Sequence, residues 1–150
     1  MEFGTIKAVC ISEKKGEQKR NVGEALLRAE FGLVGDAHGG PGPRQISLLS
    51  YDEIEAFNAA GADVTHGDFG ENLVVAGIDL KRLPLGTRLC SGDVMLELTQ
   101  IGKECHSRCQ IYDKMGDCIM PREGVFAKVL QGGKLSVGDR LEVVTVGCGI

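Results

Sequence analysis

An eight-residue segment, GKECHSRC at 102–109, holds the side chains of this sequence that are best suited to chemistry. It follows an alternating apolar stretch that predicts a β-strand, so Cys105 is expected in a loop just beyond a strand end, where a rigid element can expose it. Lys103, His106 and Arg108 surround this cysteine. Because nearby cationic charge lowers the pKa of a thiol, we predict a reactive thiolate that can attack sulfur, hold a persulfide or bind a soft metal.

The same segment leaves two other interpretations open. Cys105 and Cys109 are four residues apart and could form half of a structural zinc or iron–sulfur site. Cys118 or His106 would then supply a further ligand, although the second cysteine pair typical of such sites is missing from the sequence. The other interpretation is a polar loop whose cysteines do no chemistry. If Cys105 is the reactive thiol, Cys109 is a candidate resolving thiol.

Composition limits the classes of protein to which the chain can belong. Its 150 residues include 17 Lys and Arg and 21 Asp and Glu, a formal net charge of −4, so we expect a single domain over 1–150 that does not bind nucleic acid. A local group of cations is expected to form a solvated loop: Lys14, Lys15, Lys19 and Arg20. No apolar run reaches the ~20 residues of a membrane helix, and no secretory signal pattern opens the sequence. We therefore expect a cytoplasmic protein with reduced thiols and no membrane partner.

The hydrophobic pattern predicts mostly short strands. Alternation, or short apolar runs bounded by turn residues, indicates strands at 5–11, 44–49, 93–101 and within 132–146. The segment 22–31 fits either a helix or a pair of strands. The next segment, 32–43, holds five glycines and two prolines and is expected to be a long loop.

One helix is predicted directly after Ser50. The SYDE pattern is that of a capping box, in which Ser50 caps the amide of Glu53 and Glu53 reaches back to the first turn. Gly61 is expected to end the helix. One face of the helix gathers its apolar side chains: Ile54, Phe57 and Ala60.

A repeated pattern of turn and strand indicates the fold class. LCSGDVMLELT at 89–99 aligns without a gap with LSVGDRLEVVT at 135–145, and Gly-Asp occurs five times in the chain. Glycine accepts a positive φ and aspartate bonds the backbone of a turn, so these dipeptides predict tight turns. We expect a mainly β fold with one or two short helices, closed or nearly closed into a barrel that protects its edge strands.

The order of several motifs resembles that of the MOSC domain, named after the C-terminal region of molybdenum cofactor sulfurases. GLVGDAH, RQISLLS, GDFGENL, GIDLKRLPLGTRL, the strand before GKEC, and GVFAKVLQGGKLSVGD occur in this order and cover about residues 5–145. The resemblance implies a stand-alone, bacterial-type member with a MOSC-like β-barrel and a functional cysteine at Cys105. It further implies that Cys105 carries a persulfide for delivery to a metal–sulfur centre, or ligates molybdenum in a molybdopterin cofactor.

The resemblance also gives candidate roles to two glycine-rich loops, GDAHGG at 35–40 and GDFGEN at 67–72. Their backbone amides can turn toward the phosphate of a molybdopterin. The cationic side chains expected at the cofactor are Arg44, Lys103 and Arg122. Hydrogen bonds to the pterin ring are expected from Asp36, His38, Glu71 and Asn72. For Asp36 and Asn72, the alternative is that they only fix their loops. The GGPGP that follows GDAH departs from similar sequences, in which bulky or basic residues are frequent.

Three functional hypotheses follow. The first is a protein that binds molybdenum cofactor, carries sulfur on Cys105, or does both. The second is a molybdenum-dependent reductase of N-hydroxylated compounds, whose electrons would come from a partner because the sequence has no flavin, haem or ferredoxin-type motif. The third is a structural zinc or iron–sulfur domain. The expected partners are a cysteine desulfurase, which would hold the pyridoxal phosphate, a molybdoenzyme or an electron-transfer protein.

Overall fold

The computed structural model describes residues 3–14, 19–37, 39–42, 45–61, 66–67, 71–101 and 124–144. Within these residues, none of the helices has the length and apolar character needed to cross a membrane.

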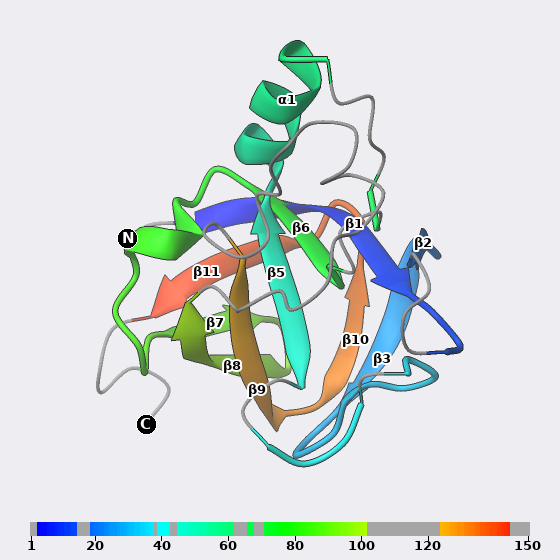
Figure 1. The fold of residues 1–150 in the computed structure, drawn as a ribbon. Coiled ribbons are helices and arrows are strands. Elements are labelled where there is room, and N and C mark those ends of the chain that lie inside the picture. Colours follow the sequence, from blue (N-terminus) through cyan, green and yellow to red (C-terminus); the bar gives the residue numbers. More distant parts are fainter. Residues whose placement is uncertain are drawn as a thin grey trace.

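Seven strands close into a barrel (Figure 1). Their order around the barrel is β1 (Phe3–Ile11), β6 (Leu73–Ala76), β5 (Ile46–Ser50), β9 (Val125–Gln131), β8 (Val94–Ile101), β7 (Arg88–Ser91) and β11 (Arg140–Val144), with β11 pairing back onto β1. Among the described strands, β5 and β6 form the one parallel pair, and the chain between them includes the helix α1 (Tyr51–Ala59). The mainly β, barrel-like fold predicted from the sequence is confirmed, and closure leaves these strands without long free edges.

A second, smaller sheet lies beside the barrel. It consists of β10 (Gly133–Ser136), β3 (Glu24–Arg28) and β4 (Gly32–Leu33), while β2 (Arg20–Asn21) extends the edge of β1. The segment 22–31, which fitted either a helix or strands, therefore contains a strand. Across the β3–β10 ladder Leu27 is buried against the barrel core, whereas Leu26 is exposed.

The strand β1 contributes to two apolar clusters, one on each face of the sheet, and a β-bulge changes which of its residues face each cluster. The pairing register of β1 with β6 shifts between Ile6 and Ala8, and Lys7 at the shift is exposed. Ile6 and Val9 consequently pack inside the barrel, while Ala8 and Cys10 pack on its outer face, under α1.

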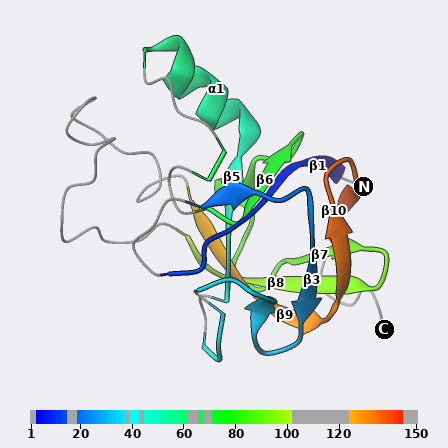
Figure 2. The same cartoon turned by 90° about the vertical axis from the view of Figure 1, so that its right-hand side faces the viewer.

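The helix α1 forms where it was predicted, with differences at both ends. Ile54 and Phe57 are buried against Ala8, Cys10, Leu49, Val74 and Phe126, so the apolar face of the helix covers the outside of the barrel. Ala60 is exposed, which makes its expected place on that face wrong, since the helix ends at Ala59. The predicted capping box is also absent from the described residues: Ser50 is the N-cap residue, but its side chain makes no capping hydrogen bond. Figures 1 and 2 show α1 standing beyond one end of the barrel.

The two aligned sequence segments fold differently beyond their turns. β7 and β8 pair with each other as a hairpin around Gly92. β10 and β11 pair with other strands, β10 with β3 and β11 with β1 and β7, so the turn at Gly138 leads the chain from the small sheet into the barrel. The turn chemistry itself is as expected, because the Asp139 carboxylate accepts a hydrogen bond from Ser136 N at 2.8 Å.

A short 3₁₀ helix, η1 (Leu80–Arg82), follows β6 and buries Leu80 in the barrel core. The predicted strands at 5–11, 44–49 and 93–101 correspond to β1, β5 and β8. In β8 the alternation is clear: Val94, Leu96 and Leu98 are buried and the residues between them are half-buried. The segment 132–146 contains two strands, β10 and β11, joined by a turn.

Candidate functional site

Asn72, at the end of the GDFGEN motif, joins two strands of the barrel through both its main chain and its side chain. Asn72 N donates to Ser47 O at 2.9 Å, and Cys10 N donates to Asn72 O at 2.6 Å. The side-chain oxygen Oδ1 accepts from Ser47 N at 2.9 Å, while Nδ2 donates to Cys10 O at 3.0 Å. Asn72 is 1% exposed. Its amide thus holds β1 and β5 at the point where β6 begins.

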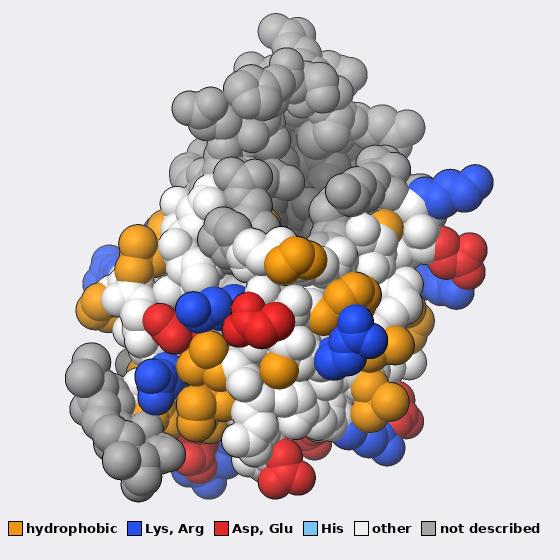
Figure 3. Space-filling view, turned by 90° about the horizontal axis from the view of Figure 1, so that it is seen from below, with side chains coloured by type: hydrophobic (Ala, Val, Ile, Leu, Met, Phe, Trp, Pro, Cys, Tyr) orange, Lys and Arg blue, Asp and Glu red, His pale blue; other side chains and the backbone are white. Residues whose placement is uncertain are grey.

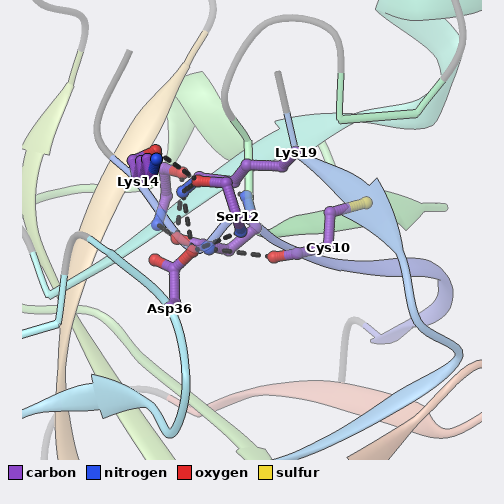
Figure 4. Close-up of polar contacts among 7 residues, drawn as sticks. Cys10, Ser12, Lys14, Lys19 and Asp36 are labelled. Carbon is purple, nitrogen blue, oxygen red and sulfur yellow. Dashed lines mark hydrogen bonds and ion pairs between the residues drawn. The ribbon is translucent and has the colours of Figure 1, made fainter. Parts of the chain in front are cut away.

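Asp36, in the GDAHGG motif, forms a buried ion pair with Lys19. Lys19 Nζ lies 2.7 Å from Asp36 Oδ1, and both side chains are 0% exposed. The same carboxylate oxygen accepts from Ser12 N at 3.0 Å, and Lys19 Nζ also donates to Ser12 Oγ at 3.1 Å. Figure 4 shows these three side chains converging, while the Cys10 sulfur points away from them. The end of β1 and the 34–37 turn are therefore held together by buried polar groups.

The surroundings of Asp36 keep its carboxylate ionised. Burial alone would raise the pKa of Asp36, but hydrogen bonds from Lys19 and Ser12, the charge of Lys19 and a hydrogen bond from Asn72 lower the pKa below its ordinary value. Asn72 contributes the smallest of these effects, and Asp36 and Asn72 both belong to the polar groups around the end of β1, where Asp36 bonds to Ser12 and Asn72 to Cys10. We call Ser12, Lys19, Asp36, Ser47 and Asn72 the rim cluster.

The backbone of Lys19 ties the start of the GDFGEN motif to the rim cluster. Lys19 N donates to Gly67 O at 2.9 Å, and Gly67 has a φ of +95°. A Cβ at residue 67 would lie 2.0 Å from Lys19 O, a separation that no real side chain tolerates. Glycine is required here because the two backbones approach too closely for any other residue.

The expected solvated loop of cations is wrong for Lys19. Its side chain is fully buried, because the Asp36 carboxylate and the Ser12 hydroxyl replace water around the ammonium group. Lys14 and Arg20 are exposed as expected, and Lys15 lies outside the described residues.

Two further polar side chains lie close in sequence to Gly67 and Asn72 and have buried polar atoms: His66, which is half-buried, and Glu71. Glu71 is 0% exposed. His66 Nδ1 is buried and accepts no hydrogen bond from the described residues, and the His66 ring lies 6.0 Å from that of Tyr51, the first residue of α1. An imidazole nitrogen and a carboxylate are both acceptors, suited to the N–H groups of a heterocyclic ligand.

The strand that precedes the 102–109 segment ends three strands away from the start of β6. β8 ends at Ile101, which pairs with Val125 of β9; Val125 pairs with Leu48 of β5, and Leu48 with Leu73 of β6. Ile101 therefore lies three strand spacings, about 14 Å along the sheet, from the residue that follows Asn72. The β8–β9 register shifts between Leu98 and Gln100, which places a β-bulge at the end of the strand.

Most of the predicted site residues lie outside the described part of the chain. They are Cys105, His106, Arg108, Lys103, Arg122, His38 and Arg44, together with Cys109 and Cys118 of the metal-site hypothesis. Within the described ranges, no group of three or more His, Cys, Asp or Glu side chains could hold a metal ion. The structure brings together Asp36 and Asn72 and gives each a role in fixing its loop.

Sequence reasoning missed Ser12, Ser47 and the burial of Lys19. The signal for Ser12 and Ser47 is weak, because single serines at strand ends occur throughout soluble proteins. For Lys19 the signal is indirect: a buried aspartate needs a cation, but nothing in the sequence selects Lys19 from the four cations of the segment.

Comparison with known proteins agrees with the fold. The family model of the MOSC domain matches residues 34–142, well over half of the chain. No curated protein sequence matches the chain significantly. The YuaD protein from Bacillus subtilis has a similar structure, with a TM-score of 0.77 at 19% identity over 94% of this chain and 95% of that one.

Two YiiM proteins are also similar in structure. The YiiM structure from Geobacillus stearothermophilus has a TM-score of 0.72 at 18% identity, over 97% of this chain and 77% of that one. YiiM from Escherichia coli has a TM-score of 0.66 at 18% identity, over 97% and 71% of the two chains. At such identities the likeness establishes the fold and nothing finer.

Proposed function

The chain belongs to the MOSC domain family, and we propose that it binds a molybdenum cofactor and carries sulfur as a persulfide on Cys105. The observation that carries this proposal is the rim cluster. It links residues of the two loops predicted to receive the cofactor, because Lys19 donates to Asp36 through Nζ and to Gly67 through its main-chain N. The strand that leads to Cys105 ends three strand spacings from β6.

Chain length allows Cys105 to reach the rim cluster. Cys105 follows Ile101 by four residues, and an extended chain of this length spans up to ~14 Å. This span matches the three strand spacings between Ile101 and Leu73. A thiol on this segment can therefore act on a group held by the 35–40 and 67–72 loops.

The described residues fit part of the proposed cofactor. His66 Nδ1 and the buried carboxylate of Glu71 are acceptors for the amino and ring N–H groups of a pterin. The buried ammonium of Lys19 is neutralised by Asp36, so the cations for the phosphate would be those outside the described residues: Arg44, Lys103 and Arg122. When bound, the cofactor supplies a molybdenum centre whose ligands include soft sulfur atoms.

The sulfur-carrying step needs only the Cys105 thiolate and a persulfide donor. The thiolate attacks the outer sulfur of a cysteine persulfide on a desulfurase, a new S–S bond forms on Cys105, and the donor cysteine leaves as a thiolate. The step is an exchange in which no external oxidant or reductant takes part. In the sequence Lys103, His106 and Arg108 flank Cys105, and their positive charge would favour the thiolate.

The first test measures the persulfide directly. The purified protein is incubated with a cysteine desulfurase and cysteine, and intact mass is recorded for wild type, Cys105→Ser and Cys90→Ser. Cys90 is the matched control, since it is a half-buried cysteine on β7. We expect a mass gain of one sulfur atom that is lost only in Cys105→Ser. An equal gain in Cys105→Ser would contradict the assignment of this cysteine.

The second test measures cofactor content. Wild type and Cys105→Ser are expressed in a host that makes molybdenum cofactor, and molybdenum and pterin are quantified per chain. We expect both in the wild type, with molybdenum reduced in the variant if the thiol is a ligand. Absence of pterin and molybdenum from the wild type would refute cofactor binding, and stoichiometric zinc would favour the structural metal site.

A further inference from the structure

Lys19 contacts three segments that are far apart in the sequence. Its Nζ donates to Asp36 Oδ1 at 2.7 Å in the 34–37 turn and to Ser12 Oγ at 3.1 Å at the end of β1. Its main-chain N donates to Gly67 O at 2.9 Å, at the start of the GDFGEN motif. Figure 4 shows the contacts of Lys19 with Ser12 and Asp36. Together with its bond to Gly67, they join Lys19 to the end of β1 and to one residue in each loop of the proposed cofactor site.

These contacts are difficult to replace. The side chains of Lys19 and Asp36 are fully buried, so water cannot substitute for either partner. Their hydrogen bond is charge-assisted and therefore among the strongest that side chains form. Because Asp36 also accepts from Ser12 N at 3.0 Å, the position of the carboxylate is fixed from two sides.

We propose that Lys19 is a positioning residue, which sets the 34–37 turn and Gly67, the first residue of the GDFGEN motif, relative to each other and to β1. Its action on a bound cofactor is indirect, since its ammonium group is occupied by Asp36 and Ser12. The part of the inference that concerns the cofactor rests on the proposed function. The part that concerns the two loops does not depend on it.

The test uses variants that remove the charges in a balanced way. Lys19→Met with Asp36→Asn removes both charges, and the new amide at position 36 still offers an oxygen to Ser12 N. Lys19→Arg retains the cation, and Lys134→Met removes an exposed lysine of the small sheet as the matched control. Hydrogen exchange of individual amides is followed by NMR without added cofactor, and molybdenum and pterin are quantified after expression in a cofactor-producing host.

We expect the double variant to stay folded, with exchange faster by about tenfold or more at Ser12, Ala37 and residue 19. Amides of the β7–β8 hairpin should keep wild-type rates. Cofactor content should fall by roughly tenfold, as when groups that orient a ligand-binding residue are lost. Lys19→Arg should retain more cofactor than the double variant, and Lys134→Met should resemble wild type.

The outcomes separate this inference from the proposed function. Wild-type exchange rates at Ser12 and Ala37 in the double variant would overturn the positioning role, whatever the cofactor content. Faster exchange with undiminished cofactor would overturn the link to the cofactor. Faster exchange in the double variant, with no pterin in the wild type, would uphold the positioning of the loops and refute the proposed function.

Discussion

Two lysine–carboxylate pairs of nearly equal length lie in opposite surroundings. Lys19 and Asp36 are 2.7 Å apart with both side chains 0% exposed, whereas Lys134 and Glu24 are 2.6 Å apart with both side chains 58% exposed. The exposed pair is screened by water and costs side-chain entropy to hold, so it adds little to stability. In the buried pair, each charge depends on the other because no water can reach it. Burial therefore determines how much each pair contributes to stability, whereas the distance between the charges does not.

The two pairs also connect different parts of the structure. Glu24 and Lys134 lie on neighbouring strands of one small sheet, where main-chain hydrogen bonds already fix the register. Lys19 and Asp36 lie in separate connecting segments, which have no common ladder. A side-chain contact therefore matters more for the relative position of two segments when no main-chain hydrogen bonds join them.

The largest effect is expected from Lys19→Met. This change leaves the Asp36 carboxylate buried without its cation, and breaking a buried pair in this way costs about 3–5 kcal/mol. Denaturant unfolding of the variant and of wild type measures the difference in the free energy of unfolding. A loss below about 1 kcal/mol would mean that water or another cation reaches Asp36, and the contrast between the two pairs would disappear.

Gly67→Ala should come next. The added Cβ would meet Lys19 O at 2.0 Å and the residue has a φ of +95°, so we expect a loss of about 3 kcal/mol. Gly92→Ala is the matched control, because Gly92 also has a positive φ, +56°, but no atom of the described residues lies within 4 Å of its Cβ position. The control should lose only about 1 kcal/mol. Equal losses would show that the approach to Lys19 is not a constraint.

The pH dependence of stability provides a third test. The pKa of Asp36 is lowered in the folded protein, so its stabilisation is complete above the unfolded pKa of about 4 and is lost as the pH falls toward the folded pKa. At pH 7 the free energy of unfolding of wild type should exceed that of Asp36→Asn by about 2 kcal/mol. The difference should narrow steadily when unfolding is measured from pH 5 to pH 3. If the difference in stability between wild type and Asp36→Asn does not vary with pH, packing and not the charge of Asp36 accounts for it.

The smallest effect is expected from Lys134→Met. Glu24 raises the pKa of Lys134, but the ammonium is solvated and its loss leaves no buried charge. Thermal unfolding at low and high salt should give the same midpoint for the variant and wild type, within error. A clear, salt-dependent decrease in the unfolding midpoint of the variant would show that the exposed pair contributes to stability more as the buried pair does.

The sequence predicted the barrel well because its strands carry a regular signal. In β8 the buried residues Val94, Leu96 and Leu98 alternate with half-buried ones, which is a local property of the chain. The apolar spacing of Ile54 and Phe57 in α1 is equally local. Glycine–aspartate turns are equally local, as Gly92 and Gly138 illustrate.

The candidate site was harder to predict, because its contacts join distant residues. Asn72 and Cys10 are separated by 62 positions, and Asp36 and Lys19 by 17. Lys19 and Arg20 are adjacent cations, but Lys19 is buried and Arg20 is exposed. Only the tertiary position of Asp36 distinguishes them. The resemblance in motif order located the two loops, but not the lysine that connects them.

Closure of the barrel has a consequence for the order of folding. The closing pair joins Phe3 in β1 to Glu142 in β11, near opposite ends of the described chain. During synthesis β1 emerges before β11 and cannot close the barrel until β11 has left the ribosome, and contacts of such large sequence separation form slowly. Throughout that interval β1 keeps an unpaired edge at residues 3–5. Nascent chains are therefore expected to be open to misfolding or chaperone binding at this strand until the last strand arrives.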